Sequence, residues 1–264
     1  MSMPDGPIWL LQTNVRDSAL VGELQQALAA QGTSWLGLGL EPFVEHVPPV
    51  AVDLSKRAVI CYGAGFVPRV ARATTWQPGI FFDDATFRWS AMQAPWRELM
   101  FATDGQLMTL AQAASMLEDK HDTCFVRPDA DNKSFDGGLY DAAALRQLNV
   151  PGTEPVVVAS NRAIDAEWRC FVVGDRIVAA SEYRRGGRPS FYPDAPDRIL
   201  DVATEAIERW GPAAVYALDL ARSGDTIGIV EANCFSAARF YAASVPLVVE
   251  AVTEYVRSDT AFGL

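Results

Sequence analysis

Short apolar runs separated by turn residues dominate this chain, and they predict many short strands with a few helices between them. In the N-terminal part, the apolar runs Ile8–Gln12, Trp35–Leu40, Ala58–Tyr62 and Pro78–Phe82 predict strands, whereas Ser18–Ala30 has helical spacing. A strand followed by a helix and then by further strands is typical of a small α/β unit with a mostly parallel sheet.

The pattern changes in the second part of the chain. Two stretches with helical periodicity, 89–101 and 107–118, lead into strands that follow one another closely. The predicted strands are 123–126, 155–158, 168–173, 177–180, 215–220 and 227–232, and the predicted helices are 142–148, 197–210 and 245–256. We therefore predict an α/β N-terminal domain over residues 1–104 and an α+β domain over residues 105–264, with a soft boundary near 102–106.

Three oxygen-bearing side chains interrupt the last two apolar strands. Asp219 is on the first strand, and Glu231 and Asn233 are two apart on the second, so the latter two point to the same face. Burying a bare carboxylate is costly, so these groups need a cation, a hydrogen-bond network or water. Hard oxygen ligands that converge are what Mg²⁺ takes. The hairpin predicts a magnesium site; the alternative is a surface hairpin whose acids face water.

The magnesium site requires that Asp219 and Glu231 share a face, which depends on the loop between the strands. A two-residue loop at Ser223–Gly224 would place Asp219 opposite Gly228 and turn Glu231 to the other side of the sheet. A three- or five-residue loop aligns the acids, and 222–225 contains the glycine that a three-residue loop needs. We therefore predict a loop of odd length.

Several cations precede this hairpin. Arg127 leaves the end of a predicted strand, and Lys133 lies in a polar loop that ends in two glycines. Cations and accessible backbone N–H groups offset the charge of a triphosphate, although the chain has no GxxxxGK[ST] motif. Alternation places Glu167 and Arg169 on one face, either as a structural ion pair or as an oriented phosphate ligand. Read alone, the polar loop is equally compatible with a solvated surface.

Composition narrows the function classes. The 264 residues carry a net charge of -11, which disfavours a general nucleic-acid partner. No apolar run reaches the ~20 residues of a membrane span, and no secretion signal is visible, so we expect a cytoplasmic protein without a membrane partner. The isolated histidines and the lack of a CxxC pair argue against zinc and against a His-based nucleophile; the cysteines, expected as buried thiols, are Cys61, Cys124, Cys170 and Cys234.

Taken in order, these residues resemble the ATP-grasp superfamily. The segments FVRP and KSF, which begin at Phe125 and Lys133, are followed by EWRCFVV from Glu167 and by the DL and IVEAN halves of the acidic hairpin. Together they are similar to a clade known from bacteria and phages and named for two arginines and a lysine. The resemblance covers residues 120–245. It implies an ATP-grasp domain, in which two lobes with antiparallel sheets clamp ATP.

The resemblance also implies roles for particular residues. Asp219, Glu231 and Asn233 would hold Mg²⁺, while Lys133 and Arg169 would act in catalysis close to the transferred phosphate. Many members have a lysine where this chain has Arg127, and Lys120 is a candidate substitute. The full set expected to contact ATP is Arg127, Lys133, Phe135, Val158, Ala159, Ser160, Glu167, Arg169, Asp219 and Glu231, with 158–160 as the hinge that meets adenine.

The implied activity is an ATP- and Mg²⁺-dependent carboxylate–amine ligase that forms an acylphosphate and acts on a small molecule, an amino acid or a peptide. Such an enzyme needs no nucleophile of its own, only positioning and charge stabilisation. The residues expected near the substrate are Tyr183, Arg184, Arg185, Arg239 and Tyr241.

Two other interpretations stay open at this point. One is a non-catalytic ATP-binding module with the same fold, since fold does not imply function. The other is a Rossmann-like dinucleotide binder, because Gly63-Ala-Gly65 follows a predicted strand and Asp83 comes twenty residues later. Its fingerprint is incomplete, because Pro68 stands where the third glycine belongs.

Overall fold

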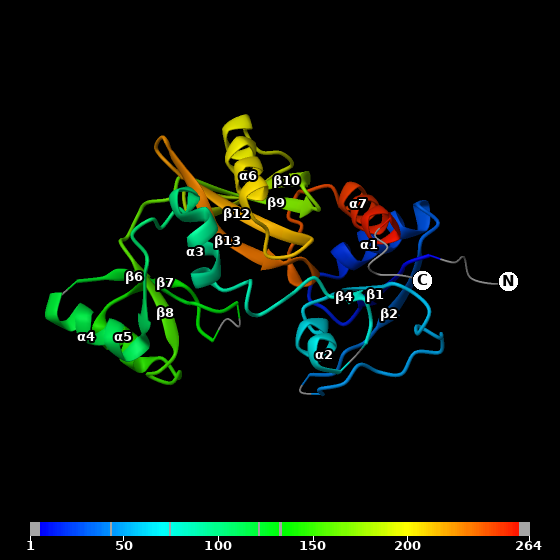
Figure 1. Ribbon diagram of the computed structural model, residues 1–264, viewed down its shortest axis with the longest axis horizontal. Coiled ribbons are helices and arrows are strands. Elements are labelled where there is room, and N and C mark those ends of the chain that lie inside the picture. Colours follow the sequence, from blue (N-terminus) through cyan, green and yellow to red (C-terminus); the bar gives the residue numbers. More distant parts are fainter. Residues whose placement is uncertain (1–5, 43, 74, 121, 132–133, 259–264) are drawn as a thin grey trace.

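The computed structural model describes residues 6–42, 44–73, 75–120, 122–131 and 134–258, and these form three sheets (Figure 1). The N-terminal sheet is parallel, with the order β2-β1-β3-β4, as the strand–helix–strand pattern predicted. Its elements are β1 (Ile8–Gln12), α1 (Ser18–Ala30), β2 (Ser34–Leu38), β3 (Val59–Tyr62), α2 (Phe66–Ala73) and β4 (Pro78–Gly79). Helix α2 was not predicted, although its Pro68 lies in the first turn, where proline is tolerated.

The central sheet is antiparallel, and its order is β11-β10-β9-β12-β13. Its strands are β9 (Ala166–Val173), β10 (Arg176–Arg185), β11 (Arg188–Tyr192), β12 (Val215–Ser223) and β13 (Thr226–Cys234). Helix α6 (Asp197–Arg209) covers the face that carries Trp168 and Leu218. The opposite face, with Phe171 and Ala217, packs against the N-terminal sheet and helix α7 (Val245–Ser258).

The third sheet forms the lobe drawn in green (Figure 1). It is antiparallel, with the order β5-β8-β6-β7, and α4 and α5 pack on it. The elements are β5 (Gln106–Thr109), α4 (Leu110–Lys120), β6 (Cys124–Pro128), β7 (Gly138–Tyr140), α5 (Ala142–Gln147) and β8 (Pro155–Ala159). The predicted α/β unit and the two antiparallel lobes are thus confirmed.

A helical connector joins the N-terminal sheet to this lobe. Helix α3 (Trp89–Trp96) contains Pro95 and passes into a 3₁₀ turn (Arg97–Leu99), so the predicted helix over 89–101 is shorter than expected. After the turn, Met100 pairs with Ile229 of β13, and the Phe101 N–H donates to the Ile229 carbonyl at 2.8 Å. The connector therefore covers the outer edge of β13. The boundary at residue 104 remains a prediction.

Among the described helices, none is long and apolar enough to cross a bilayer.

Candidate active site

The acidic hairpin has a two-residue loop, so the predicted odd-length loop is wrong. Ser223 pairs with Thr226, which leaves Gly224 and Asp225 as the turn. Gly224 has a positive φ of 55°, as glycine does at the first loop position of a type II′ turn. Its N–H donates to the Asp165 carboxylate at 2.7 Å, which fixes the turn from outside the hairpin.

A β-bulge restores the alignment that the loop alone would destroy. Leu220 pairs with Ile229, but the next pair is Asp219 with Glu231, so Val230 is the extra residue of the bulge. Because the bulge shifts the register by one residue, the two acids face the same side. The predicted shared face is therefore present, although its cause is the bulge and not the loop.

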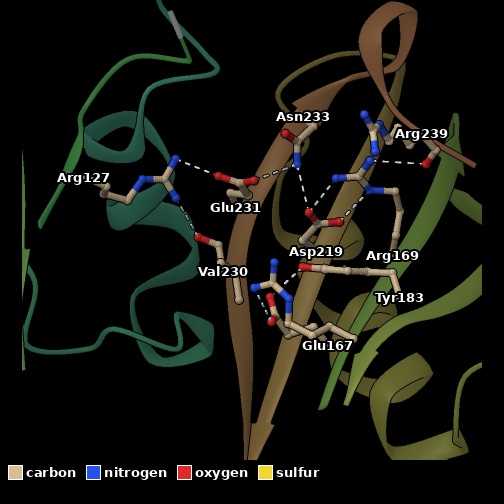
Figure 2. Close-up of polar contacts among 10 residues, drawn as sticks. Arg127, Glu167, Arg169, Tyr183, Asp219, Val230, Glu231, Asn233 and Arg239 are labelled. Carbon is tan, nitrogen blue, oxygen red and sulfur yellow. Dashed lines mark hydrogen bonds and ion pairs between the residues drawn. The ribbon is translucent and has the colours of Figure 1, made fainter. Parts of the chain in front are cut away.

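The centre of the site is a buried ion pair (Figure 2). Arg169 on β9 lies opposite Asp219 on β12, and its Nε and Nη2 atoms donate to the two carboxylate oxygens at 2.8 and 2.7 Å. Both side chains are less than a tenth exposed. Arg169 also donates to the carbonyl of Arg239 at 3.2 Å. The bidentate geometry fixes the guanidinium on this face of the sheet.

A polar chain continues from this pair to the other lobe. The amide nitrogen of Asn233 donates to Asp219 at 3.1 Å and to Glu231 at 3.2 Å. Glu231 in turn accepts an ion pair of 2.8 Å from Arg127, which stands on β6 of the third sheet. Arg127 also donates to the Val230 carbonyl at 3.3 Å, the group exposed by the bulge. Residues from three sequence regions therefore meet between the two antiparallel sheets.

A second acid lies on the same face, nearer the hinge. The Glu167 carboxylate accepts from the hydroxyl of Tyr183 at 2.8 Å and from Arg184 at 3.0 Å. A bulge in β10 makes this possible, because Arg184 pairs with Glu167 while Glu182 pairs with Trp168. Each acid on this face is thus matched by an arginine.

Burial controls the protonation of these groups. It raises the pKa of Asp219, with Glu231 and Glu167 adding to the effect, while Arg169 opposes it. Burial disfavours the charged form of Arg169, but Asp219 outweighs this effect and keeps the pKa of the guanidinium above its usual range. Burial also raises the pKa of Tyr183, so its hydroxyl keeps the proton that it donates to Glu167. Two buried thiols behave alike, since burial raises the pKa of Cys170 to about 12 and of Cys234 to about 11.

The oxygen donors fit the requirements of Mg²⁺. Asp219 and Glu231 are linked through Asn233, and a half-turn of its amide would present an oxygen where the nitrogen now lies. Magnesium is held by one or two carboxylates together with waters and substrate phosphates, so two acids and an amide suffice. Within the described ranges, no cluster of three or more His, Cys, Asp or Glu side chains could hold a metal ion.

A pocket opens beside this polar chain, between the third sheet and β13. Ala159 and Ser160, at the end of β8, line it together with Arg127, whereas Val158 points into the core beneath α4. The N–H of Ser160 donates to the Asp104 carboxylate at 3.1 Å. The sequence interpretation missed most of the pocket, because apolar residues from distant segments carry no motif; they include Trp89, Phe101, Phe125, Val157, Ile164 and Ile229.

The remaining predicted residues are distributed as follows. Lys133 lies outside the described residues, as does the side chain of Lys120. Phe135 is buried in the core of the third sheet, where it meets Tyr140 edge to face. Arg185 is not brought to this face, because it bonds to Glu182 and pairs with Ala166 on the side covered by α6.

The glycine loop after β3 serves the packing of the N-terminal sheet. The Gly65 N–H donates to the side chain of Gln12 at 2.9 Å, and the Gly63 N–H donates to the Ser236 carbonyl at 2.7 Å. A Cβ on Gly63 would lie 2.3 Å from the Cβ of Gln12. These glycines allow close approach of protein segments, which accounts for them without a dinucleotide.

Comparison with known proteins identifies the fold independently. The model of an ATP-grasp domain family, the third family of the clade named for two arginines and a lysine, matches residues 61–252, which confirms the resemblance. No curated protein sequence matches the chain.

Solved structures show the same fold at low sequence identity. A RimK domain ATP-grasp protein from Sphaerobacter thermophilus is 16% identical, with a TM-score of 0.64 over 94% of this chain and 98% of that one. The ATP-grasp ligase PsnB, complexed with a minimal precursor, is 14% identical (TM-score 0.58; 96% and 100% covered). The macrocyclase MdnC from Microcystis aeruginosa, bound with precursor peptide MdnA, is 15% identical (TM-score 0.58; 96% and 99% covered).

Proposed function

Because the chain belongs to this third family of the two-arginine, one-lysine clade of ATP-grasp domains, we propose that it is an ATP- and Mg²⁺-dependent ligase that joins a carboxylate to an amine. The observation that carries this proposal is the convergence of Asp219, Glu231 and Asn233 with two arginines from different sheets. This arrangement offers oxygen ligands to a cation and guanidinium groups to phosphates at one place.

In the proposed reaction, a substrate carboxylate oxygen attacks the γ-phosphorus of ATP, and ADP leaves. The resulting acylphosphate is attacked at its carbonyl carbon by an amine, which loses a proton as phosphate leaves and an amide bond forms. Magnesium, when bound, neutralises charge on the phosphates. Arg169 is held rigidly by Asp219 and is placed to stabilise negative charge that develops on the transferred group.

The pocket beside this site suits a nucleotide base. Its lining is largely apolar and aromatic, and it opens next to Arg127, so a base in the pocket would direct phosphates toward the guanidinium. The Ser160 N–H, now bonded to Asp104, is the backbone donor that we assign to the base edge. Lys133 stays in the proposal as a further phosphate ligand on the strength of the sequence resemblance alone.

A peptide is the proposed substrate class. The structures of PsnB and MdnC were solved with precursor peptides, although identities near 15% transfer the fold and not the substrate. The second candidate is an ATP-binding module without turnover. It is favoured by one feature, since both oxygens of Asp219 are already occupied by Arg169.

The test is release of ADP and phosphate from ATP and Mg²⁺ across a panel of carboxylates, amines and short peptides. We expect turnover in the wild type and its loss, by at least a hundredfold, in Asp219→Ala and Glu231→Ala. Glu98→Ala, which breaks an exposed ion pair with Arg209, serves as the control and should keep full activity. Circular dichroism checks that the variants fold.

Two outcomes would contradict the proposal. Unchanged activity in both acid variants would remove the assigned metal site. ATP binding without turnover across the whole panel would establish the non-catalytic module instead.

A further inference from the structure

Three aromatic rings form a column beside the buried ion pair. The rings of Tyr183 and Tyr241 stack with centroids 4.9 Å apart and planes 15° apart, and Tyr241 stacks on Phe191 at 5.7 Å and 25°. The guanidinium of Arg169 lies 5.2 Å from the Tyr241 ring centroid and 5.8 Å from that of Tyr183. The column therefore leads from the site outward to Phe191.

The middle ring is held in an unfavourable backbone conformation. Tyr241 has a φ of 54°, and within the described ranges it is the only residue other than glycine with a positive φ. A bulky side chain in this region costs roughly 1–3 kcal/mol, and such conformations persist where surrounding structure imposes them, often at ligand sites. The strain places the tyrosine ring between its two neighbours, so the column is a built feature of this face.

The outer ring is exposed although it belongs to the column. Phe191 lies on the edge strand β11 and is 63% accessible to solvent. Two cations flank this face: Arg184, which is half exposed and bonds to Glu167, and Arg239, which is exposed and gives its carbonyl to Arg169. An exposed aromatic face beside cations, in a chain of net charge -11, complements a ligand with an aromatic group and a carboxylate.

We propose that the outer face of Phe191 is a specificity subsite for an aromatic side chain of a peptide substrate. The aromatic residue would stack on Phe191 immediately before the acidic residue whose carboxylate is activated, while that carboxylate lies toward Arg169. This inference rests on the proposed ligase function and adds to it the sequence context of the substrate. An offset stack of this kind contributes about three- to tenfold in affinity.

The chain contains a matched control for this subsite. Tyr192 is the next residue on the same strand and is 65% exposed, close to the value for Phe191. It pairs with Glu182, whose partner Trp168 packs beneath α6, so it belongs to the opposite face. Both side chains are exposed, so Phe191→Ala and Tyr192→Ala should both melt at the wild-type temperature.

The experiment compares two blocked dipeptides, acetyl-phenylalanyl-glutamyl amide and acetyl-glycyl-glutamyl amide. Binding to the protein with Mg²⁺ and a non-hydrolysable ATP analogue is measured by saturation-transfer NMR. We expect wild type and Tyr192→Ala to bind the aromatic peptide three- to tenfold more tightly than the glycine peptide. Phe191→Ala should bind the two equally.

Equal binding of both peptides by the wild type would overturn the inference, and so would a preference that survives Phe191→Ala. Failure of the ligase proposal would look different. A protein with the aromatic preference that releases no ADP would retain the subsite and lose the ligase assignment, whereas turnover without the preference would do the reverse.

Discussion

Arg169 has the largest number of distinct roles of any single residue in the site. It pairs with Asp219 through two hydrogen bonds, donates to the Arg239 carbonyl and lies against two tyrosine rings. Two buried charges gain little net stability from each other, because each loses its water. Removing one partner is far more costly, since the other charge then remains buried alone. The stability of the site should therefore depend strongly on this arginine.

We expect Arg169→Met to lower the free energy of unfolding by about 3–5 kcal/mol, measured by urea denaturation. Arg127→Met is the matched control, because its pair with Glu231 keeps more contact with water, at 16% and 25% side-chain exposure. The control should lose clearly less. Equal losses in the two variants would show that the buried pair has no special importance.

The same variant predicts a dependence on pH. Burial already raises the pKa of Asp219, and Arg169 is the main opposing influence, so its loss raises that pKa further. A carboxyl whose folded pKa lies above its unfolded value of about 3.9 binds protons more readily when folded. The stability of Arg169→Met relative to wild type should therefore increase as the pH falls toward about 4. A difference that stays constant from pH 7 to 4 would contradict this.

At the scale of single elements, β13 determines the geometry of the hairpin and accepts the connector at its outer edge. Gly228 makes the contact possible, since a Cβ there would lie 2.6 Å from both the N and the Cα atom of Phe101. These are backbone atoms, so a larger residue must displace the connector. The pairing of Met100 with Ile229 would then be disturbed.

Gly228→Ala should therefore lower stability by about 1–3 kcal/mol in thermal unfolding, as overpacking does elsewhere. Gly22→Ala is the control with the opposite expected sign. Gly22 lies within helix α1, where a Cβ would meet nothing within 4 Å, and alanine should stabilise the helix by up to about 1 kcal/mol. Gly228→Ala with wild-type stability would show that the connector adapts freely.

These elements also show what the sequence can predict. Helix α1 has the predicted bounds because its apolar positions recur with helical spacing. The edge strands β5 and β7 were missed, since Leu107 and Leu139 are more than half exposed and show no buried face to detect. The acids of the site were found as polar exceptions on apolar strands. The bulge at Val230 was not, because nothing in the pattern Ile-Gly-Ile-Val distinguishes a paired residue from an extra one.

At the scale of the whole molecule, the two ends of the chain are packed together. Helix α7 lies against α1, and one core cluster joins side chains from the N-terminal sheet, the central sheet and α7 (Figure 1). The indole N–H of Trp9 donates to the hydroxyl of Thr253 at 3.0 Å, and both residues are buried. The N-terminal sheet therefore depends on the last helix for part of its core.

Thr253→Val keeps the shape of the side chain and removes the acceptor of this hydrogen bond. A buried indole N–H without a partner costs about 1–3 kcal/mol, so urea unfolding should shift by that amount in one transition. Thr226→Val, at an exposed position of β13, should change stability by less than about 0.5 kcal/mol. A second, separate transition in Thr253→Val would show that the N-terminal sheet unfolds independently.

The ion pair between Arg127 and Glu231 has a consequence for how tightly a nucleotide can be held. In the free protein, the guanidinium lies against the carboxylate that we assign to a metal ion, and the carboxylate lies against the guanidinium that we assign to phosphate. Each group is the other's surrogate ligand. Loading Mg²⁺ and ATP is then a double displacement in which both groups change partners, so the measured affinity is the difference between two similar sets of contacts. A site built this way favours turnover over retention, because the departing nucleotide leaves two charges that immediately recombine.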